Sequence, residues 1–326
     1  MYEPVGVGLL ATSPLFEGLP ASDLVDLARV VRRRSVSAGD VLWHQGTAAK
    51  GMAIIIEGRV AVALRLPGDR TVDLAEVGPG ETLGELPLID GGPHSATARV
   101  TEAGSMLFLS RADFVAFLSR PGPVACVLWR GFVGVATARL RRQLAYLGDS
   151  LGPPPSGRAA AGPAPTPAQL EFTGPPDSRY IRRMANFRAF EPLALWGFLT
   201  RGRYARVERG QTLEEEGGPA TGLYVVINGG VERVVIRGDR RIRVGLAGPG
   251  RAFGYEGLID GEPAPSTAIA RERALLLVLS PDAFARLFQG DIDESLVFLD
   301  VITRDAAAWL RQALRPQARL ATGPIA

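Results

Sequence analysis

Gly51-Met-Ala-Ile-Ile-Ile-Glu-Gly58 is matched later in the chain by Gly222-Leu-Tyr-Val-Val-Ile-Asn-Gly229, an apolar run between two glycines in both cases. The segments around these two runs also correspond, because Gly-Pro-Gly and Leu-Ile-Asp-Gly follow in the same order, beginning at Gly78, Leu88, Gly248 and Leu258. The registers agree to within one residue over a separation of about 170 residues. The chain therefore contains two tandem copies of one domain.

Within each copy, short runs rich in Val, Ile and Leu are interrupted by Gly or Pro at intervals of roughly 8–12 residues. Examples in the first copy are Val41–Trp43, Val60–Leu66 and Met106–Leu109. Such spacing is typical of many short antiparallel strands that close into a barrel or a sandwich. We expect two tandem β-barrels.

Helical periodicity flanks both predicted barrels. The expected helices are residues 22–31, 111–118 and 124–147 in the first copy, and 191–199, 281–288 and 295–314 in the second. Between the copies, residues 151–176 are rich in Pro, Ala and Gly, a composition that buries too little apolar surface to fold. We therefore divide the chain into a first domain at 1–150, a linker at 151–178 and a second domain at 179–326.

Composition argues against several classes of protein. The formal net charge is only +3, which does not indicate nucleic-acid binding. One cysteine and two histidines offer little material for a metal site or a Cys/His nucleophile pair, so we expect no enzyme activity, no metal and no cofactor. No apolar run reaches the roughly 20 residues of a membrane span, and the N-terminus lacks a secretory pattern. These features predict a cytoplasmic protein.

The segment Leu83-Gly-Glu-Leu-Pro-Leu-Ile-Asp-Gly-Gly-Pro-His-Ser-Ala-Thr97 combines a glycine, the start of a short helix and a turn of small residues. A glycine permits close backbone approach, and the first turn of a helix offers free N–H groups to an anion. The segment resembles the phosphate-binding cassette of cyclic-nucleotide-binding domains, as found in protein kinase A regulatory subunits and the catabolite-activator family. This resemblance implies two mainly β domains with flanking α-helices, each a double-stranded β-helix or jelly roll.

The resemblance assigns the residues of the first cassette by position. Gly84 and Glu85 match the family's glycine and its ribose-binding glutamate, and Ser95, Ala96 and Thr97 match the small residues that leave room for the base. His94 occupies the position of the phosphate-binding arginine, nine residues after Glu85. An imidazole that is uncharged at pH 7 loses the bidentate cation that an arginine provides. The expected ligand site is Gly84, Glu85, Leu86, His94, Ser95, Ala96 and Thr97.

The second cassette, from Phe253 to Thr267, departs further from the family pattern. Gly254 matches the glycine, but Tyr255 stands at the glutamate position and Ala264 at the arginine position, and Glu256 is one residue out of register. We expect a degenerate second site at Gly254, Tyr255, Glu256, Ser266 and Thr267, which binds an ordinary cyclic mononucleotide poorly.

The long helices after the barrels carry more apolar residues than one barrel face requires, including Trp129, Phe132 and Val133. This excess predicts a homodimer or a protein partner that binds through 124–147 and 295–314, and Thr137 is a candidate contact for the base. A helix-turn-helix domain follows the long helix in catabolite-activator proteins. Here the linker and a short tail follow instead, so we expect no direct DNA binding.

These sequence features are consistent with three alternative functions. The first is a cytoplasmic sensor in which the first domain binds cAMP or a related cyclic nucleotide, and ligand binding shifts the long helix and changes a dimer or partner interface. The second is a tandem-barrel interaction scaffold whose pockets are both degenerate and which ignores nucleotides. The third is a pair of cassettes retuned for a cyclic dinucleotide.

Overall fold

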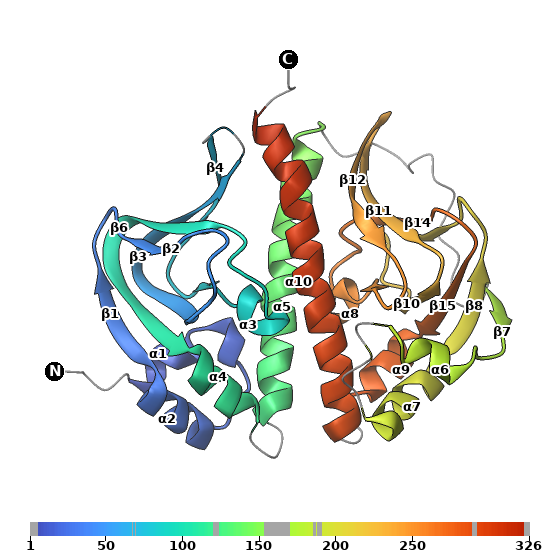
Figure 1. The fold of residues 1–326 in the computed structure, drawn as a ribbon, viewed down its shortest axis with the longest axis horizontal. Helices are drawn as coiled ribbons and strands as arrows, with labels where there is room; N and C mark the ends of the chain where they lie inside the picture. The colour runs from blue at the N-terminus through green and yellow to red at the C-terminus, as the bar shows by residue number, and fades with distance from the viewer. Residues whose placement is uncertain are drawn as a thin grey trace. The chain divides into compact units, whose positions relative to one another are not determined.

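The computed structural model describes residues 6–66, 68, 70–119, 124–152, 170–184, 187, 191–288 and 292–322. These residues separate into two compact units (Figure 1). The first unit comprises Met1–Val135 with Gln317–Ala326, and the second comprises Ala136–Pro316. The greater part of the predicted linker, residues 153–169, lies outside the described residues.

The first unit is built around a single six-stranded antiparallel sheet that curls into a barrel, with short helices at one end (Figure 1). Strands β3 and β6 form its backbone, because they run side by side for most of their length and pair with every other strand of the sheet between them. Register shifts along the β3–β6 pairing bend both strands around the barrel. The elements of this part of the chain are α1 (Val7–Ala11), η1 (Pro14–Phe16), α2 (Ala21–Val30), β1 (Arg32–Val36), β2 (Val41–Trp43), β3 (Gly51–Arg65), β4 (Thr71–Val77), β5 (Thr82–Leu83), α3 (Leu86–Asp90), β6 (Thr97–Ser110), α4 (Arg111–Leu118) and α5 (Val124–Asp149).

The second barrel repeats this arrangement with shorter strands. The equivalents of β3 and β6 are each divided in two, so the strands form one sheet in the order β13-β10-β15-β8-β7 and another in the order β12-β11-β14-β9. The elements are β7 (Glu171–Thr173), α6 (Ser178–Ile181), α7 (Pro192–Thr200), β8 (Arg203–Val207), β9 (Thr212–Glu214), β10 (Leu223–Asn228), β11 (Val231–Arg237), β12 (Arg240–Ala247), β13 (Ala252–Phe253), α8 (Glu256–Asp260), β14 (Thr267–Ala270), β15 (Ala274–Leu279), α9 (Pro281–Arg286) and α10 (Ile292–Thr322).

The expectation of two helix-flanked β-barrels is confirmed, and most predicted helices lie within a few residues of their expected ends. Two elements differ. The end of the predicted linker forms β7, which pairs with β8 and lengthens the second sheet. Helix α10 continues beyond its predicted end at residue 314, through Pro316 to Thr322, although a proline removes one helical N–H.

Apolar side chains of the two long helices are buried within the chain itself. In α5 the exposed fraction is 1% or less for Phe132, Val133, Leu140 and Leu144, and in α10 the same holds for the apolar side chains Phe298, Leu299, Val301, Ile302, Ala306, Ala307, Trp309, Leu310 and Ala313. The interface predicted for these two helices stays a prediction.

Candidate functional site

The first cassette begins at a glycine in the left-handed backbone region. Gly84 has a φ of 78° and follows β5, and the five-residue helix α3 starts two residues later. A Cβ added at Gly84 would lie 3.1 Å from Cη2 of Trp43 and 3.2 Å from the carbonyl oxygen of Gly51, so the position favours glycine on two counts. Glu85 and Leu86 come next and are 1% and 8% exposed.

The other half of the cassette is fixed by its backbone. The N–H of His94 donates to the carbonyl of Thr47, and the carbonyl of His94 accepts from the N–H of Gly46, both at 2.9 Å. Thr97 accepts a hydrogen bond at its Oγ1 from the N–H of Gln45 at 3.1 Å. Ala96 is buried, whereas Ser95 and Thr97 are half-buried. The cassette tail is therefore held by the segment between β2 and β3.

Trp43 lies between these two halves. Its indole is stacked on the imidazole of His94, with ring centroids 4.6 Å apart and an angle of 7° between the planes. The far edge of the same indole limits the space at Gly84. His94 is only 4% exposed, and the stacked Trp43 indole covers one face of its ring. Trp43 thus joins Gly84 and His94, two predicted site residues that are ten positions apart in the sequence.

Thr137, the candidate base contact, lies on α5. Its side chain is fully buried and its Oγ1 has no hydrogen-bond partner among the described residues. Thr137 groups with the second compact unit, whereas the first cassette belongs to the first unit. Its contact with a base stays a prediction.

The second cassette has the same backbone shape as the first. Gly254 has a φ of 83°, α8 follows, and Gly261 ends that helix in the left-handed conformation. Tyr255, Glu256, Ser266 and Thr267 are at most 3% exposed. Burial raises the pKa of Tyr255 well above its ordinary value, and the Asp305 and Glu256 carboxylates raise it further. The side chain at the family's glutamate position is therefore a neutral phenol.

Strand pairing shows what replaces the apolar interior of the first barrel in the second. Ala98 of β6 pairs with Val62 on one side and with Trp43 on the other. Its counterpart Ala268 of β14 pairs with Arg233 on one side and with Glu214 on the other. The first residue of the cassette helix is Leu86 in the first barrel and Glu256 in the second. Three charged residues, Glu214, Arg233 and Glu256, thus stand where the first barrel has Trp43, Val62 and Leu86.

These three charged residues are buried together. Arg233 is 0% exposed, and its Nη1 donates to Oε1 of Glu256 at 2.5 Å while its Nε donates to Oγ of Ser266 at 2.9 Å. Glu214 is 1% exposed, and neither of its carboxyl oxygens has a hydrogen-bond partner among the described residues. Burial and the nearby Glu256 carboxylate raise the pKa of Glu214 to about 8, although Arg233 and Arg141 act to lower it. At neutral pH this interior contains a neutral acid beside a compensated ion pair.

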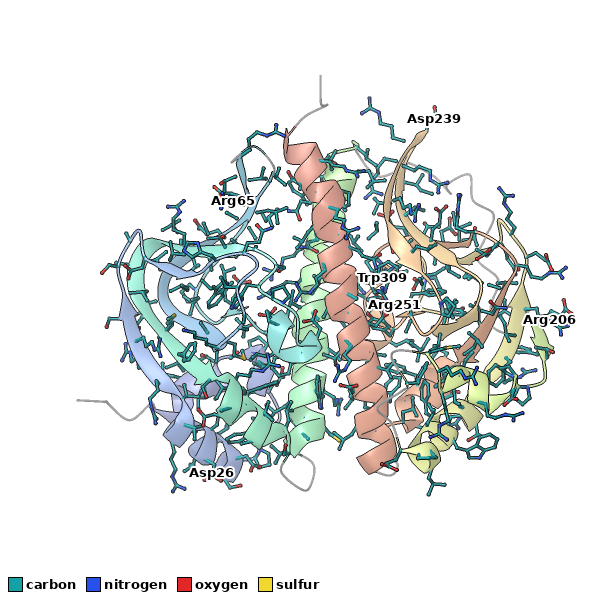
Figure 2. All side chains as sticks on the ribbon, in the orientation of Figure 1. Asp26, Arg65, Arg206, Asp239, Arg251 and Trp309 are labelled. Carbon is teal, nitrogen blue, oxygen red and sulfur yellow. The ribbon has the colours of Figure 1, made fainter. Side chains whose placement is uncertain are left out.

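Helix α10 borders this charged interior through Trp309. The guanidinium of Arg233 lies 4.9 Å from the centre of the Trp309 ring, and that of Arg251 lies 4.8 Å from it. Nε1 of Trp309 donates to the carbonyl of Ala252 at 2.9 Å, and Arg251 forms an ion pair with Asp305. Figure 2 labels Trp309 and Arg251 where α10 meets the second barrel. The cassette and the helix are therefore joined by side chains of the protein alone.

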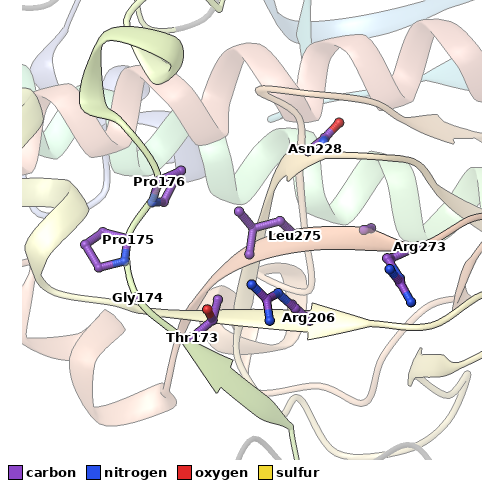
Figure 3. A pocket seen from close by; sticks show the side chains of 9 residues that line it. Thr173, Gly174, Pro175, Pro176, Arg206, Asn228, Arg273 and Leu275 are labelled. Atoms are coloured by element: carbon purple, nitrogen blue, oxygen red, sulfur yellow. The ribbon is translucent and has the colours of Figure 1, made fainter.

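A separate open cavity of about 560 Å³ lies on the outside of the second barrel. Its lining residues are Thr173, Gly174, Pro175, Pro176, Arg206, Asn228, Arg273, Ala274 and Leu275 (Figure 3). Arg273 forms an ion pair with Glu208, and Glu171 is the strand partner of Arg206. The cavity contains no predicted site residue and its cations have acidic neighbours, so we do not assign it a ligand.

The described part of the chain contains no group of three or more His, Cys, Asp or Glu side chains arranged to hold a metal ion. Among the same residues, we find no helix with the length and apolar character needed to cross a membrane.

The model of the cyclic nucleotide-binding domain family matches residues 33–120 and 204–291, which together make up more than half of the chain. The chain therefore belongs to the cyclic nucleotide-binding domain family, a family defined by binding rather than by catalysis. The resemblance inferred from the two cassettes is confirmed, as is the tandem arrangement.

Individual relatives cover parts of the chain. A cyclic nucleotide-gated potassium channel of Mesorhizobium japonicum is 38% identical over 117 residues, which is 36% of this chain and 31% of the channel. The cyclic AMP receptor protein of Thermus thermophilus is 37% identical over 109 residues, 33% of this chain and 50% of the receptor. The chain thus spans half or less of the length of these relatives. The regulatory domain of Toxoplasma gondii protein kinase A, solved with cAMP, has a TM-score of 0.34 at 18% identity and covers 88% of this chain and 92% of that one.

Proposed function

We propose that the chain is a cyclic-nucleotide sensor whose ligand site is the cassette of the first barrel. The observation that carries this proposal is the position of Glu85, which follows the left-handed Gly84 and is buried at the start of α3. A buried carboxylate at the start of a helix is suited to accept hydrogen bonds from sugar hydroxyls. Membership of the family supplies the class of ligand.

Each part of the first cassette has a role in this proposal. Glu85 accepts from the ribose, the N–H groups at the start of α3 face the cyclic phosphate, and Leu86 packs beside the sugar. Ser95, Ala96 and Thr97 leave room for the base. His94 donates to the phosphate more weakly than an arginine does, because an imidazole lacks the planar, permanently charged fork of a guanidinium. The cAMP receptor among the relatives favours cAMP as the first ligand to test.

The output of the sensor is a movement of α5 that changes an interface with a second copy or with a protein partner in the cytoplasm. A ligand changes such an equilibrium only by binding the two states with different affinity, so a nucleotide must contact the barrel differently when α5 moves. The chain acts as a binding protein without a reaction of its own.

Calorimetric titration of the full chain with cAMP, cGMP and cyclic dinucleotides tests the ligand site. Glu85→Ala should lower the affinity for the bound nucleotide by at least tenfold, since it removes charge-assisted hydrogen bonds to the sugar. Glu17→Ala is the matched control, because it makes the same change at an exposed position of the same unit. Saturable binding that is equal in the wild type and in Glu85→Ala would remove this site from consideration. Preference for a cyclic dinucleotide would favour a ligand larger than a mononucleotide.

A second candidate is an interaction scaffold that does not bind nucleotides. The stacking of His94 on Trp43 favours it, because that indole covers one face of the side chain at the family's arginine position. A ligand that binds only the native state must raise its apparent stability. A thermal melt that ignores every nucleotide would therefore support the scaffold, and a shift of several degrees with one nucleotide would exclude it.

A further inference from the structure

The cassette of the second barrel is already occupied by a side chain of the same chain. Ser266 belongs to the small-residue tail of that cassette, and Glu256 belongs to its helix. Arg233, which comes from β11, contacts both of them. A positive group therefore lies against the cassette, where the family's arginine position, Ala264, supplies none.

The charges around Arg233 disfavour an anionic ligand. Glu256 forms an ion pair with Arg233, and both side chains are 0% exposed. A cyclic phosphate placed here would compete with Glu256 for the guanidinium and leave one negative charge buried without a partner. Leaving a buried charge uncompensated is strongly unfavourable. The first barrel has no such obstacle at the equivalent positions, where Val62 and Leu86 are apolar.

Arg233 also contacts the helix that follows the barrel. Its guanidinium lies over Trp309 of α10, which in turn donates to the backbone of β13 at Ala252. A desolvated guanidinium over an indole is a favourable cation–π contact. Arg251 adds a second guanidinium near Trp309 and pairs with Asp305 of the same helix.

We propose that Arg233 acts as a built-in substitute for a ligand in the second barrel, where it fills the cassette and holds α10 through Trp309 without any nucleotide. Arg233 is a positioning residue, Glu256 and Ser266 fix its guanidinium, and Trp309 carries the effect to the helix. The two barrels then differ in kind. A ligand can regulate the first barrel, whereas the second barrel holds α10 in the same position with or without a nucleotide.

The first test needs no change in the second barrel. Hydrogen exchange of the α10 segment 300–312 is measured in the full-length Glu85→Ala protein, with and without millimolar cAMP, cGMP or cyclic dinucleotide. We expect this segment to exchange slowly in every sample, with no effect of nucleotide. Slower exchange with any nucleotide would show that the second barrel admits a ligand and would overturn the proposal.

The second test is chemical rescue. Arg233→Ala removes the guanidinium, so exchange in 300–312 should accelerate at least tenfold, and ethylguanidinium at millimolar concentration should restore protection in a saturable manner. Arg243→Ala is the control, because Arg243 is an exposed arginine on β12 of the same barrel. Unchanged exchange in Arg233→Ala overturns the proposal. Faster exchange without rescue also overturns it, since the loss then reflects packing in general.

If Arg233→Ala does not fold, Glu256→Gln provides the same readout. Glutamine keeps the shape and a hydrogen bond but removes the charge that orients the guanidinium, so exchange in 300–312 should rise severalfold; no change overturns the proposal. These results are separate from the function proposed for the first barrel. Failure of nucleotide binding there changes the calorimetry of the wild type, whereas it leaves the exchange and rescue experiments on α10 unaffected.

Discussion

The imidazole of His94 lies flat on the indole of Trp43, with the ring centroids 4.6 Å apart, at the position to which the cassette resemblance assigns a phosphate-binding arginine. In the proposed site, this pair limits the affinity for the phosphate. A stacked imidazole keeps its ring nitrogens at its edge, so it offers a single directional donor rather than a fork.

His94→Arg should therefore strengthen binding of cAMP to the first barrel by roughly tenfold or more, because hydrogen bonds to charged groups contribute about 1.5–3 kcal/mol. The arginine can keep the stacking contact with Trp43. Calorimetry on both proteins measures the change. Ala264→Arg places the same residue at the equivalent position of the second barrel and should produce no new nucleotide site. Weaker binding by His94→Arg would show that the phosphate does not approach residue 94.

Gly84→Ala should destabilise the first barrel more than Gly91→Ala does. Both glycines have positive φ, 78° and 71°, so alanine costs about 1–2 kcal/mol of backbone strain at either position. Only at Gly84 would the new Cβ also approach Trp43 and the carbonyl of Gly51, whereas nothing lies within 4 Å at Gly91. Overpacking adds about 1 kcal/mol or more. Urea denaturation of the two variants gives the difference, and equal losses would contradict the close contact at Gly84.

Much of this fold could be predicted from the sequence, because repeated glycine-containing segments and the periodicity of apolar residues indicate it. The repeated Gly-Pro-Gly and Leu-Ile-Asp-Gly segments fixed the register of the two copies, and α4 lies where helical spacing places it, from Arg111 to Leu118. Pro316 did not end α10, and β7 formed within a segment whose composition indicated a linker. For β7, pairing with β8 outweighed local composition.

The interior of the second barrel was not predicted, although the sequence carries a signal for it. The copy-to-copy alignment sets Glu214, Arg233 and Glu256 against Trp43, Val62 and Leu86, three charges where the other copy is apolar. Charged residues on exposed strands are common, so this substitution gains meaning only when the barrel closes and brings Arg233 to Glu256. Trp43 was missed as a site residue for the same reason, since only the folded barrel brings it to both Gly84 and His94.

The stability of the second barrel should fall as pH rises from about 4.5 to 8. The folded-state pKa of Glu214 is raised to about 8 from an ordinary value of 4.5, so in this range the folded state holds a proton that the unfolded chain releases. The stability that the protonated Glu214 contributes is fully present below the pKa of this group in the unfolded chain. It is lost as the pH rises through the pKa of Glu214 in the folded protein. Calorimetric melting between pH 4.5 and 8.5 measures it.

Glu214→Gln is the control for this pH dependence, because the amide resembles the protonated acid and does not titrate. The slope should become flatter in Glu214→Gln, with the largest gain over the wild type at the alkaline end. The neighbouring groups Glu256, Tyr224, Arg233 and Arg141 are retained in the variant, so their own contributions remain. An identical slope in both proteins would show that Glu214 ionises normally.

Arg141 should stabilise the second unit through its contacts with the turn that ends α8. Its guanidinium forms a two-pronged ion pair with Asp260, at 2.5 and 2.8 Å, and also donates to the carbonyls of Glu262 and Pro263. The side chains of Arg141 and Asp260 are 21% and 26% exposed, so the pair is partly buried. Solvent and salt therefore screen it less than they screen a fully exposed ion pair. The geometry is bidentate, the form in which an arginine–carboxylate pair contributes most.

Arg141→Ala should cost about 1–2 kcal/mol of unfolding free energy, and Asp260→Ala somewhat less, because the two carbonyls remain as acceptors. A double-mutant cycle measured by urea denaturation should give a coupling energy of about 0.5–1 kcal/mol that shrinks in high salt. Additive losses in the two single variants would mean that Arg141 and Asp260 stabilise the unit independently, so that the ion pair between them contributes no coupling energy.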